Sequence, residues 1–205
     1  DFVGSRGLGD VYKRQASSAI PARVSITRPA PAIDAITTAR SMLEGAERPM
    51  VIAGGSVWDD GSIADLSRFA ASFGVPAACS FRRQRLMNNL DPHYAGDLGL
   101  GCNPALLERI RGSDCLILLG GRLSEIPSQS YTLLDIPSPQ MPLIHVHPSS
   151  GELGRVYTPT LGIETSPGAF LTAMMQGREV TTGAKPMPEH LSLIHISEPT
   201  RPNEI

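Results

Sequence analysis

Two short apolar runs, each ending in a pair of glycines, constrain the fold of this chain more than any other feature. The first is PMVIAGGS at Pro49–Ser56, and the second is GSDCLILLGGRL at Gly112–Leu123. A short apolar run bounded by turn residues is typical of a strand buried on both faces, as in a parallel sheet. Glycine lets the backbone turn sharply after such a strand and leaves room for a ligand. The sequence therefore predicts two buried parallel strands with glycine turns at their carboxyl ends.

The residues of these two turns are the candidate ligand-binding residues. They are Gly54, Gly55, Ser56, Gly120, Gly121 and Arg122. In open parallel sheets, ligands bind outside the carboxyl ends of the strands, where an arginine adds a positive charge. Neither turn has the GxGxxG or GxxxxGK[ST] spacing of the dinucleotide and P-loop motifs. Two interpretations stay open: a nucleotide crevice, or two plain glycine turns beside a solvated arginine.

Helical and extended patterns alternate along the rest of the chain. Apolar spacing predicts helices that begin near residues 33, 62, 104 and 167, and further strands at 76–80, 142–148 and 160–165. The second helix is expected to start with a capping box of Ser62 and Asp65 and to stop at Gly74. This alternation predicts an α/β fold. We expect a Rossmann-like, doubly wound, mostly parallel sheet of five to six strands, with helices on both faces.

Residues 81–102 read FRRQRLMNNLDPHYAGDLGLGC and are predicted to form one long irregular segment. Connections of this length in compact domains are usually functional or mobile. The segment carries a basic cluster of Arg82, Arg83 and Arg85. The cluster fits either a solvated loop or a contact with a cofactor phosphate.

Composition argues against several classes of protein. The net charge of −2 predicts no binding to nucleic acid or to an anionic membrane surface. No apolar run approaches the roughly 20 residues that cross a bilayer. Cys79, Cys102 and Cys115 form no CxxC pair, which indicates a reducing, cytoplasmic setting. His145 and His147 share one face of a predicted strand, but without a third or fourth ligand nearby we predict no metal site.

Both ends of the sequence resemble translated sequencing-library adapter. The stretches concerned are DVYKRQ at Asp10–Gln15 and SLIHISEPTRP at Ser192–Pro202. Segments of this origin would not contribute to the native fold. We therefore expect residues 1–15 and 186–205 to be non-native or disordered tails around one domain at 16–185.

The ordered set of motifs resembles the central domain of thiamine diphosphate-dependent enzymes of the acetolactate synthase and benzoylformate decarboxylase group. The matching stretches are RPMVIAGG (Arg48–Gly55), FGVPAACS (Phe73–Ser80), LDPHYAGDLG (Leu90–Gly99), GSDCLILLGGRL (Gly112–Leu123) and LIHVHP (Leu143–Pro148). The resemblance covers roughly residues 20–175. It implies a fragment of a larger enzyme: a Rossmann-like domain that carries no catalytic residue.

The resemblance also implies the chemistry of the parent enzyme. That parent would act on a 2-oxo acid with thiamine diphosphate and Mg²⁺, both held by domains that flank the central one. It would be a cytoplasmic homo-oligomer, either a dimer or a tetramer. Some branches bind FAD or another nucleotide in the central domain, but His145 and His147 stand where flavin-binding members often have two aspartates. Asp59-Asp60-Gly61 does not match the family's magnesium motif, because the downstream asparagine context is missing.

Two alternatives to this assignment stay open. One is a nucleotide- or FAD-binding module similar to that of electron-transfer flavoproteins. The other is a purely structural domain that bridges subunits and binds no ligand.

Overall fold

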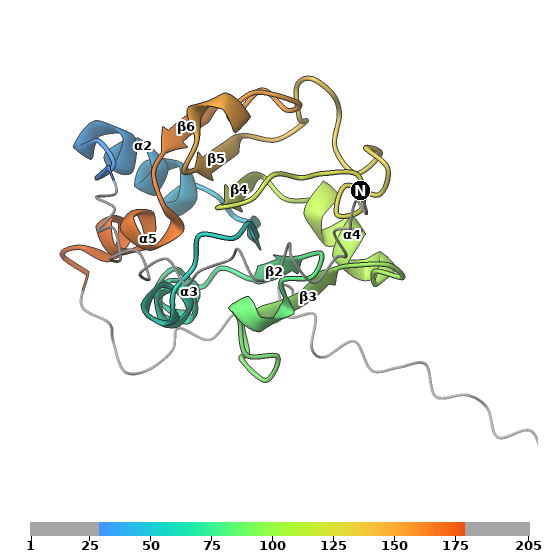
Figure 1. Cartoon of the computed structure of the whole chain (residues 1–205), viewed down its shortest axis with the longest axis horizontal. Coiled ribbons are helices and arrows are strands. Elements are labelled where there is room, and N and C mark those ends of the chain that lie inside the picture. Colours follow the sequence, from blue (N-terminus) through green and yellow to red (C-terminus); the bar gives the residue numbers. More distant parts are fainter. Residues whose placement is uncertain (1–28, 179–205) are drawn as a thin grey trace, which may run out of the picture.

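Six parallel strands form one sheet in the computed structural model of this protein, which describes residues 29–178 (Figure 1). The strands are β1 (Pro49–Ala53), β2 (Ala77–Ser80), β3 (Tyr94–Leu98), β4 (Cys115–Leu119), β5 (Leu143–His147) and β6 (Leu161–Glu164). Their order in the sheet is β3-β2-β1-β4-β5-β6, and every adjacent pair is parallel. This order confirms the predicted doubly wound α/β fold. It also places the topological switch point, where ligands of such sheets bind, between β1 and β4.

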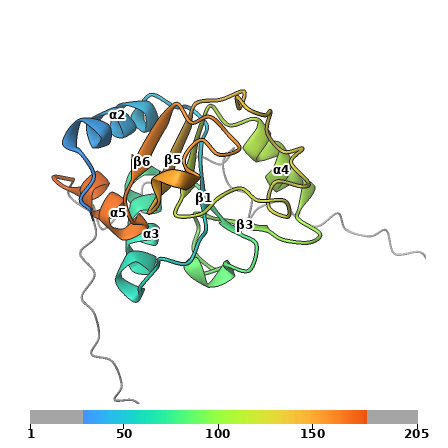
Figure 2. The same ribbon diagram turned by 45° about the horizontal axis from the view of Figure 1, so that its top comes forward.

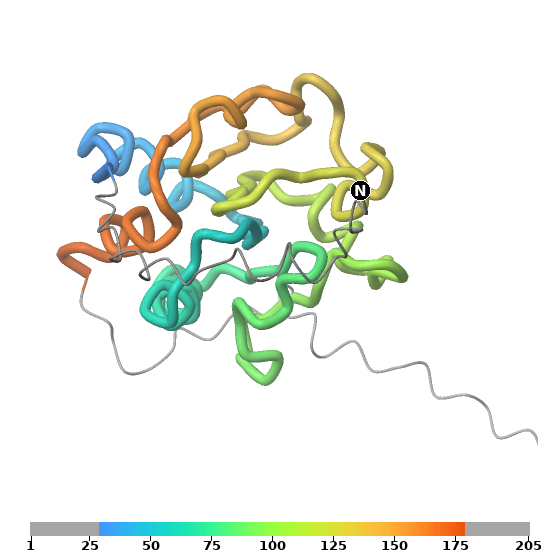
Figure 3. The backbone as a smooth tube through the Cα atoms, in the orientation of Figure 1, coloured from blue at the N-terminus to red at the C-terminus, as the bar shows by residue number. Residues whose placement is uncertain are grey.

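Helices cover both faces of the sheet, as predicted. They are α2 (Ile33–Glu44), α3 (Asp60–Phe73), α4 (Pro104–Arg111) and α5 (Pro167–Met175), with short 3₁₀ turns η1 (Gln84–Leu86) and η2 (Ser150–Glu152). Helices α2, α3 and α5 lie on one side, and α4 lies on the other (Figure 2). The long connection from β4 to β5 lies on the same side as α4, as the yellow tube of Figure 3 shows.

The two central strands are buried along their whole length, as their apolar runs predict. Because side chains alternate along a strand, β1 contributes to two separate cores. Val51 and Ala53 pack towards α2, α3 and α5. Met50 and Ile52 pack towards α4 and the β4–β5 connection. The switch point is therefore held rigidly from both faces.

The prediction that residues 81–102 are irregular throughout is wrong. The segment contains η1 and the whole of β3, which pairs only with β2 at the edge of the sheet. Its sequence, YAGDL, combines a glycine and an aspartate, which strands usually avoid, and it lacks the apolar run of a central strand. Pairing with β2 makes this stretch a strand, and pairing is not readable from the stretch itself.

The predicted capping box of α3 is also wrong, because the helix begins three residues earlier. Asp59 is the N-cap, and its carboxylate accepts a hydrogen bond of 2.8 Å from the Ser62 N–H. In return the Ser62 hydroxyl accepts the Asp59 N–H at 2.9 Å. The predicted stop is confirmed, since Gly74 ends α3 in the left-handed conformation with φ of 64°.

The expected tails at 1–15 and 186–205 lie outside the described residues, as do the first and last parts of the expected domain. Within 29–178, no helix combines the length and the apolar character needed to cross a membrane.

Candidate functional site

The two glycine turns lie directly against each other at the switch point. A β-carbon on Gly55 would overlap the carbonyl oxygen of Gly120 and lie 2.7 Å from its carbonyl carbon. A β-carbon on Gly121 would lie 2.8 Å from the Gly55 nitrogen. Glycine is therefore required at these two positions, because the backbones of the two turns touch each other. This reason for the paired glycines is visible only once β1 and β4 are neighbours.

The same turns leave peptide N–H groups without acceptors. The N–H groups of Gly54 and Gly120 continue the sheet, donating to Leu119 O at 2.9 Å and to Val146 O at 2.8 Å. Within the described part of the chain, the next N–H groups on each turn have no hydrogen-bond acceptor. These belong to Gly55, Ser56, Gly121 and Arg122. Clustered peptide N–H groups of this kind favour an anionic ligand.

A pocket of about 320 Å³ opens at this place. Gly55, Ser56, Val57, Arg83, Gly120, Gly121, Arg122, His147, Pro148 and Glu152 line it. Five of the six predicted site residues are thus brought together at one pocket. Gly54 does not line it, because this residue is buried beneath the turns. We call this pocket the glycine pocket.

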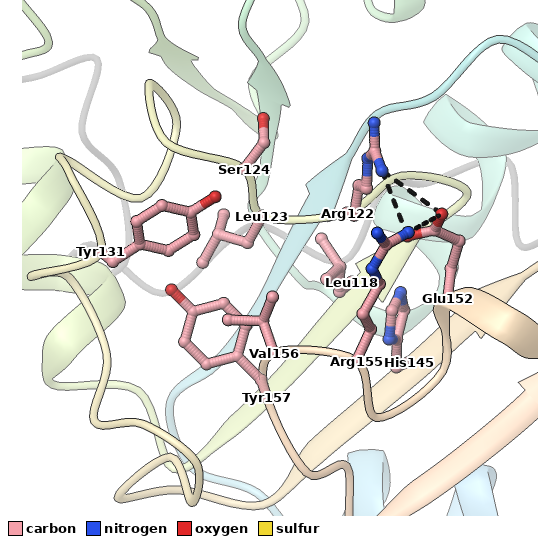
Figure 4. Close-up of a pocket in the computed structure, with 10 residues that line it drawn as sticks. All are labelled: Leu118, Arg122, Leu123, Ser124, Tyr131, His145, Glu152, Arg155, Val156 and Tyr157. Atoms are coloured by element: carbon pink, nitrogen blue, oxygen red, sulfur yellow. Dashed lines mark hydrogen bonds and ion pairs between the residues drawn. The ribbon is translucent and has the colours of Figure 1, made fainter.

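A second pocket, of about 240 Å³, adjoins the first, because the two share Arg122 and Glu152. Figure 4 shows its lining. Its apolar part is built from Leu118, Leu123 and Val156, with the rings of Tyr131 and Tyr157 facing each other across it. Burial raises the pKa of Tyr157, so its hydroxyl stays neutral at physiological pH. We call this the tyrosine pocket. Its lining suits a flat apolar group that carries a few polar atoms.

Tyr131 reaches the tyrosine pocket from a left-handed turn. Gln129, Ser130 and Tyr131 all have positive φ, at 53°, 56° and 62°. Each such non-glycine residue costs about 1–2 kcal/mol. The turn is held by hydrogen bonds from Ser130 N–H to Glu125 O at 2.7 Å and from Tyr131 N–H to the Ser128 hydroxyl at 2.9 Å. Strained backbone that neighbouring structure holds in place is common at binding sites.

An ion-pair cluster separates the two pockets, since Arg122 and Glu152 line both. One guanidinium nitrogen of Arg122 lies 3.3 and 3.4 Å from the two carboxylate oxygens of Glu152. Arg155 approaches the same carboxylate at 3.1 Å (Figure 4). Desolvation favours the neutral acid, but the two guanidinium groups outweigh it and lower the pKa of Glu152. Arg122 is exposed, as predicted, but it is not free: Glu152 partly balances its charge.

His145 and His147 have separate hydrogen-bond partners. Nε2 of the buried His145 lies 3.0 Å from the carbonyl oxygen of Gly121 and so supports the second glycine turn. Nδ1 of His147 accepts the Ser149 N–H at 3.1 Å. Burial lowers the pKa of His145, although its bond to Gly121 opposes that shift. His145 is therefore a neutral support of the turn at physiological pH.

Acidification from about pH 7 to pH 5 is expected to destabilise the domain through His145. In the unfolded chain His145 binds a proton with the ordinary pKa of 6.5. In the folded chain its pKa is lower, so it binds the proton only at lower pH. Protonation therefore favours the unfolded state, by at most about 1.4 kcal/mol per pH unit below that value. Urea denaturation at several pH values measures the slope.

The matched variant for this test is His145→Gln, which cannot titrate. Its stability should depend less on pH over the same range, whatever its absolute value. Glu152 does not confuse the comparison, because its lowered pKa affects stability only below about its ordinary 4.5. Equal slopes for the two proteins would contradict the role given to His145.

The Asp59-Asp60-Gly61 stretch, which does not match the magnesium motif, has a structural role instead. The carboxylate of Asp59 caps α3. Within residues 29–178, no three His, Cys, Asp or Glu side chains come together as metal ligands would. The described residues therefore do not fit the Mg²⁺-bound diphosphate of thiamine.

Strand order and the paired glycine turns define a doubly wound α/β domain with a pocket at its switch point, the place where such sheets bind ligands. The sequence family described as thiamine pyrophosphate enzyme, central domain, matches residues 36–174. The chain belongs to that family. This confirms the resemblance drawn from the motifs, and the electron-transfer flavoprotein alternative is not favoured.

Individual relatives agree with this membership. The chain is 24% identical over 166 residues to sulfoacetaldehyde acetyltransferase of Rhodobacter capsulatus, covering 81% of this chain and 28% of the relative. It is 26% identical over 141 residues to the acetolactate synthase isozyme 2 large subunit of Escherichia coli K12, covering 69% and 25%.

A solved structure supports the fold. Benzoylformate decarboxylase from Polynucleobacter necessarius superposes with a TM-score of 0.57 at 16% identity, covering 81% of this chain and 31% of that one. The chain thus spans between a quarter and a third of the length of these three proteins.

Several residues that line the tyrosine pocket were not among the predicted ones, and the main polar ones are Tyr131, Glu152, Arg155 and Tyr157. Only Glu152 had a local signal, the arginine three residues later. The two tyrosines lie on loops far apart in the sequence and meet only in the folded chain.

Proposed function

We propose that this chain is the central domain of a thiamine diphosphate-dependent enzyme that makes or breaks a carbon–carbon bond of a 2-oxo acid, and that its own task is to bind a nucleotide. Membership of the central-domain family supports the first part. The second part rests on one observation, the glycine pocket with its peptide N–H groups directly beside the tyrosine pocket. No residue of the domain is proposed as a catalytic acid, base or nucleophile.

The two pockets bind different parts of the nucleotide. The diphosphate lies at the glycine pocket, with Gly55, Ser56, Gly120, Gly121 and Arg122 as its proposed binding residues. Gly54, the sixth residue expected from the sequence, is not among them, because its N–H donates to Leu119 O within the sheet. Peptide N–H groups and a guanidinium are the donors that phosphate oxygens prefer. The base lies in the tyrosine pocket between Tyr131 and Tyr157. FAD and ADP share this diphosphate and an adenine, so both are candidate ligands.

Thiamine diphosphate and Mg²⁺ belong to the proposed parent enzyme and bind outside residues 29–178. They supply the nucleophile and electron sink of the reaction when bound. The 2-oxo acid substrate binds with them. We also propose that the parent is a cytoplasmic homo-oligomer, a dimer or a tetramer. Sequencing of the whole gene tests the placement of the cofactors, since it would show the pyrimidine- and diphosphate-binding domains in the same reading frame. Size-exclusion chromatography of its product tests the oligomeric state.

Calorimetry on the full 205-residue chain should give a saturable heat with ADP or with FAD. The same chain should give no saturable heat with thiamine diphosphate and Mg²⁺, and no decarboxylation of pyruvate or benzoylformate. The reason is that the described residues offer donors for a nucleotide diphosphate but no carboxylate cluster for Mg²⁺.

Each outcome of this experiment decides between functions. A chain that binds neither nucleotide, and releases none when denatured after purification, would favour a domain that only bridges subunits. Turnover that scales with protein and survives repurification would overturn the assignment of a non-catalytic domain.

A further inference from the structure

The basic cluster of the β2–β3 connection contains three arginines whose surroundings differ. The guanidinium of Arg82 lies 5.0 Å from the centre of the Phe81 ring. Arg85 is highly exposed and points towards Asp60, at 3.9 Å. Arg83 is half-buried and lines the glycine pocket. Only Arg83 of the three is placed to meet a ligand at the glycine turns.

The backbone directs Arg83 to that position. The chain reverses just after β2, where Arg82 takes a left-handed conformation with φ of 59° and the Arg83 N–H donates to Ser80 O at 2.9 Å. Ser80 lies against the first glycine turn, because a β-carbon on Gly54 would be 3.0 Å from its Cβ. A non-glycine residue in this conformation costs about 1–2 kcal/mol, and the surrounding fold must hold it. The reversal brings Arg83 back over the end of β1.

Charge distinguishes Arg83 from Arg122, the other arginine of the glycine pocket. Arg122 shares the carboxylate of Glu152 with Arg155. Arg83 makes no ion pair, ring contact or side-chain hydrogen bond with any residue in 29–178. The other titratable groups of the pocket are Glu152, already paired with two guanidinium groups, and His147. An uncompensated guanidinium gains more from an incoming phosphate than one that must leave a carboxylate.

We propose that Arg83 is the main phosphate-binding side chain of the glycine pocket, and that Arg122 contributes less because its guanidinium is paired with Glu152. This inference rests on the nucleotide-binding function proposed above and names the residue that determines its affinity. The phosphate lies between the peptide N–H groups of the two turns on one side and Arg83 on the other. Arg122 serves mainly to join the two pockets through its pair with Glu152.

Calorimetric titration of the full-length chain with ADP, and separately with inorganic pyrophosphate, tests the inference. Arg83→Gln should weaken binding of both probes at least tenfold, because both present the same phosphates. Arg85→Gln is the matched control, since it removes an equal charge from the same loop outside the pocket, and it should change affinity less than twofold. Arg122→Gln should weaken ADP binding less than Arg83→Gln does.

The possible results distinguish the role of Arg83 from the proposed nucleotide binding itself. Wild-type binding of ADP with equal affinities for the Arg83 and Arg85 variants would overturn the role of Arg83 and leave nucleotide binding standing. A larger loss for Arg122→Gln than for Arg83→Gln would also overturn it. Wild-type protein that binds neither ADP nor FAD would remove the proposed function itself. Circular dichroism of each variant confirms that lost affinity is not lost folding.

Discussion

Replacing Gly55 by alanine is expected to destabilise the domain by about 3–5 kcal/mol, which is a large part of the stability of an ordinary domain. Two costs combine at this position. The residue has φ of 77°, which side chains disfavour, and its β-carbon would overlap the backbone of Gly120. The overlapped atoms belong to the main chain of a buried strand end and cannot move aside. Urea denaturation followed by circular dichroism measures the loss.

Gly101→Ala is the matched control for this prediction. Gly101 has nearly the same backbone conformation, with φ of 73°, but no neighbouring atom within 4 Å of its β-carbon position. It should therefore cost only the conformational strain, about 1–2 kcal/mol. Similar losses for the two variants would show that β1 and β4 do not hold their glycine turns in contact.

Replacing Arg109 by methionine is expected to stabilise the domain by about 1–3 kcal/mol. Arg109 lies on α4 and is 6% exposed, with one hydrogen bond of 3.2 Å to Pro49 O. Its Nε and Nη1 groups have no partner among the described residues. Burial, and then the like charge of Arg48, lower its pKa, while Asp114 opposes them. Methionine retains much of the side-chain volume without a buried charge.

Arg111→Met is the control for Arg109, because it changes the same residue type on an exposed position of the same helix. Its effect on the free energy of unfolding, measured by urea denaturation, should be small, within about 0.5 kcal/mol. Destabilisation by Arg109→Met would show instead that the guanidinium has a partner outside residues 29–178. That result would direct the search for an interdomain contact to the end of the sheet opposite the glycine pocket.

Both positions bear on the proposed function in different ways. The Gly55 contact forms the floor of the pocket at which the diphosphate is proposed to bind. The guanidinium of Arg109, on α4, lies beside Pro49 at the start of β1, at the other end of the sheet. Substitution of Gly55 is therefore expected to lower the affinity for a nucleotide. Substitution of Arg109 is not, provided that the variant folds.

The amino-acid sequence by itself determined the features that depend on neighbouring residues. The apolar runs of β1 and β4 could be read directly, because a strand buried on both faces needs continuous apolar side chains. Helix α5 was readable from Ser166 and Pro167, which fit the first turn of a helix whatever surrounds it. The alternation of such elements was enough to predict the α/β class. The ordered motifs were enough to predict the family.

Only the tertiary structure decided which residues meet at the site. Strand β3 exists because β2 offers it hydrogen-bond partners. The pairing of Arg122 with Glu152 joins residues 30 positions apart, so no local pattern could reveal it. The glycines of both turns could be recognised as turn residues from the sequence. The sequence does not show that each glycine turn leaves space for the backbone of the other turn. This contact depends on β1 and β4 being neighbours in the sheet, since close packing is a property of neighbours in space.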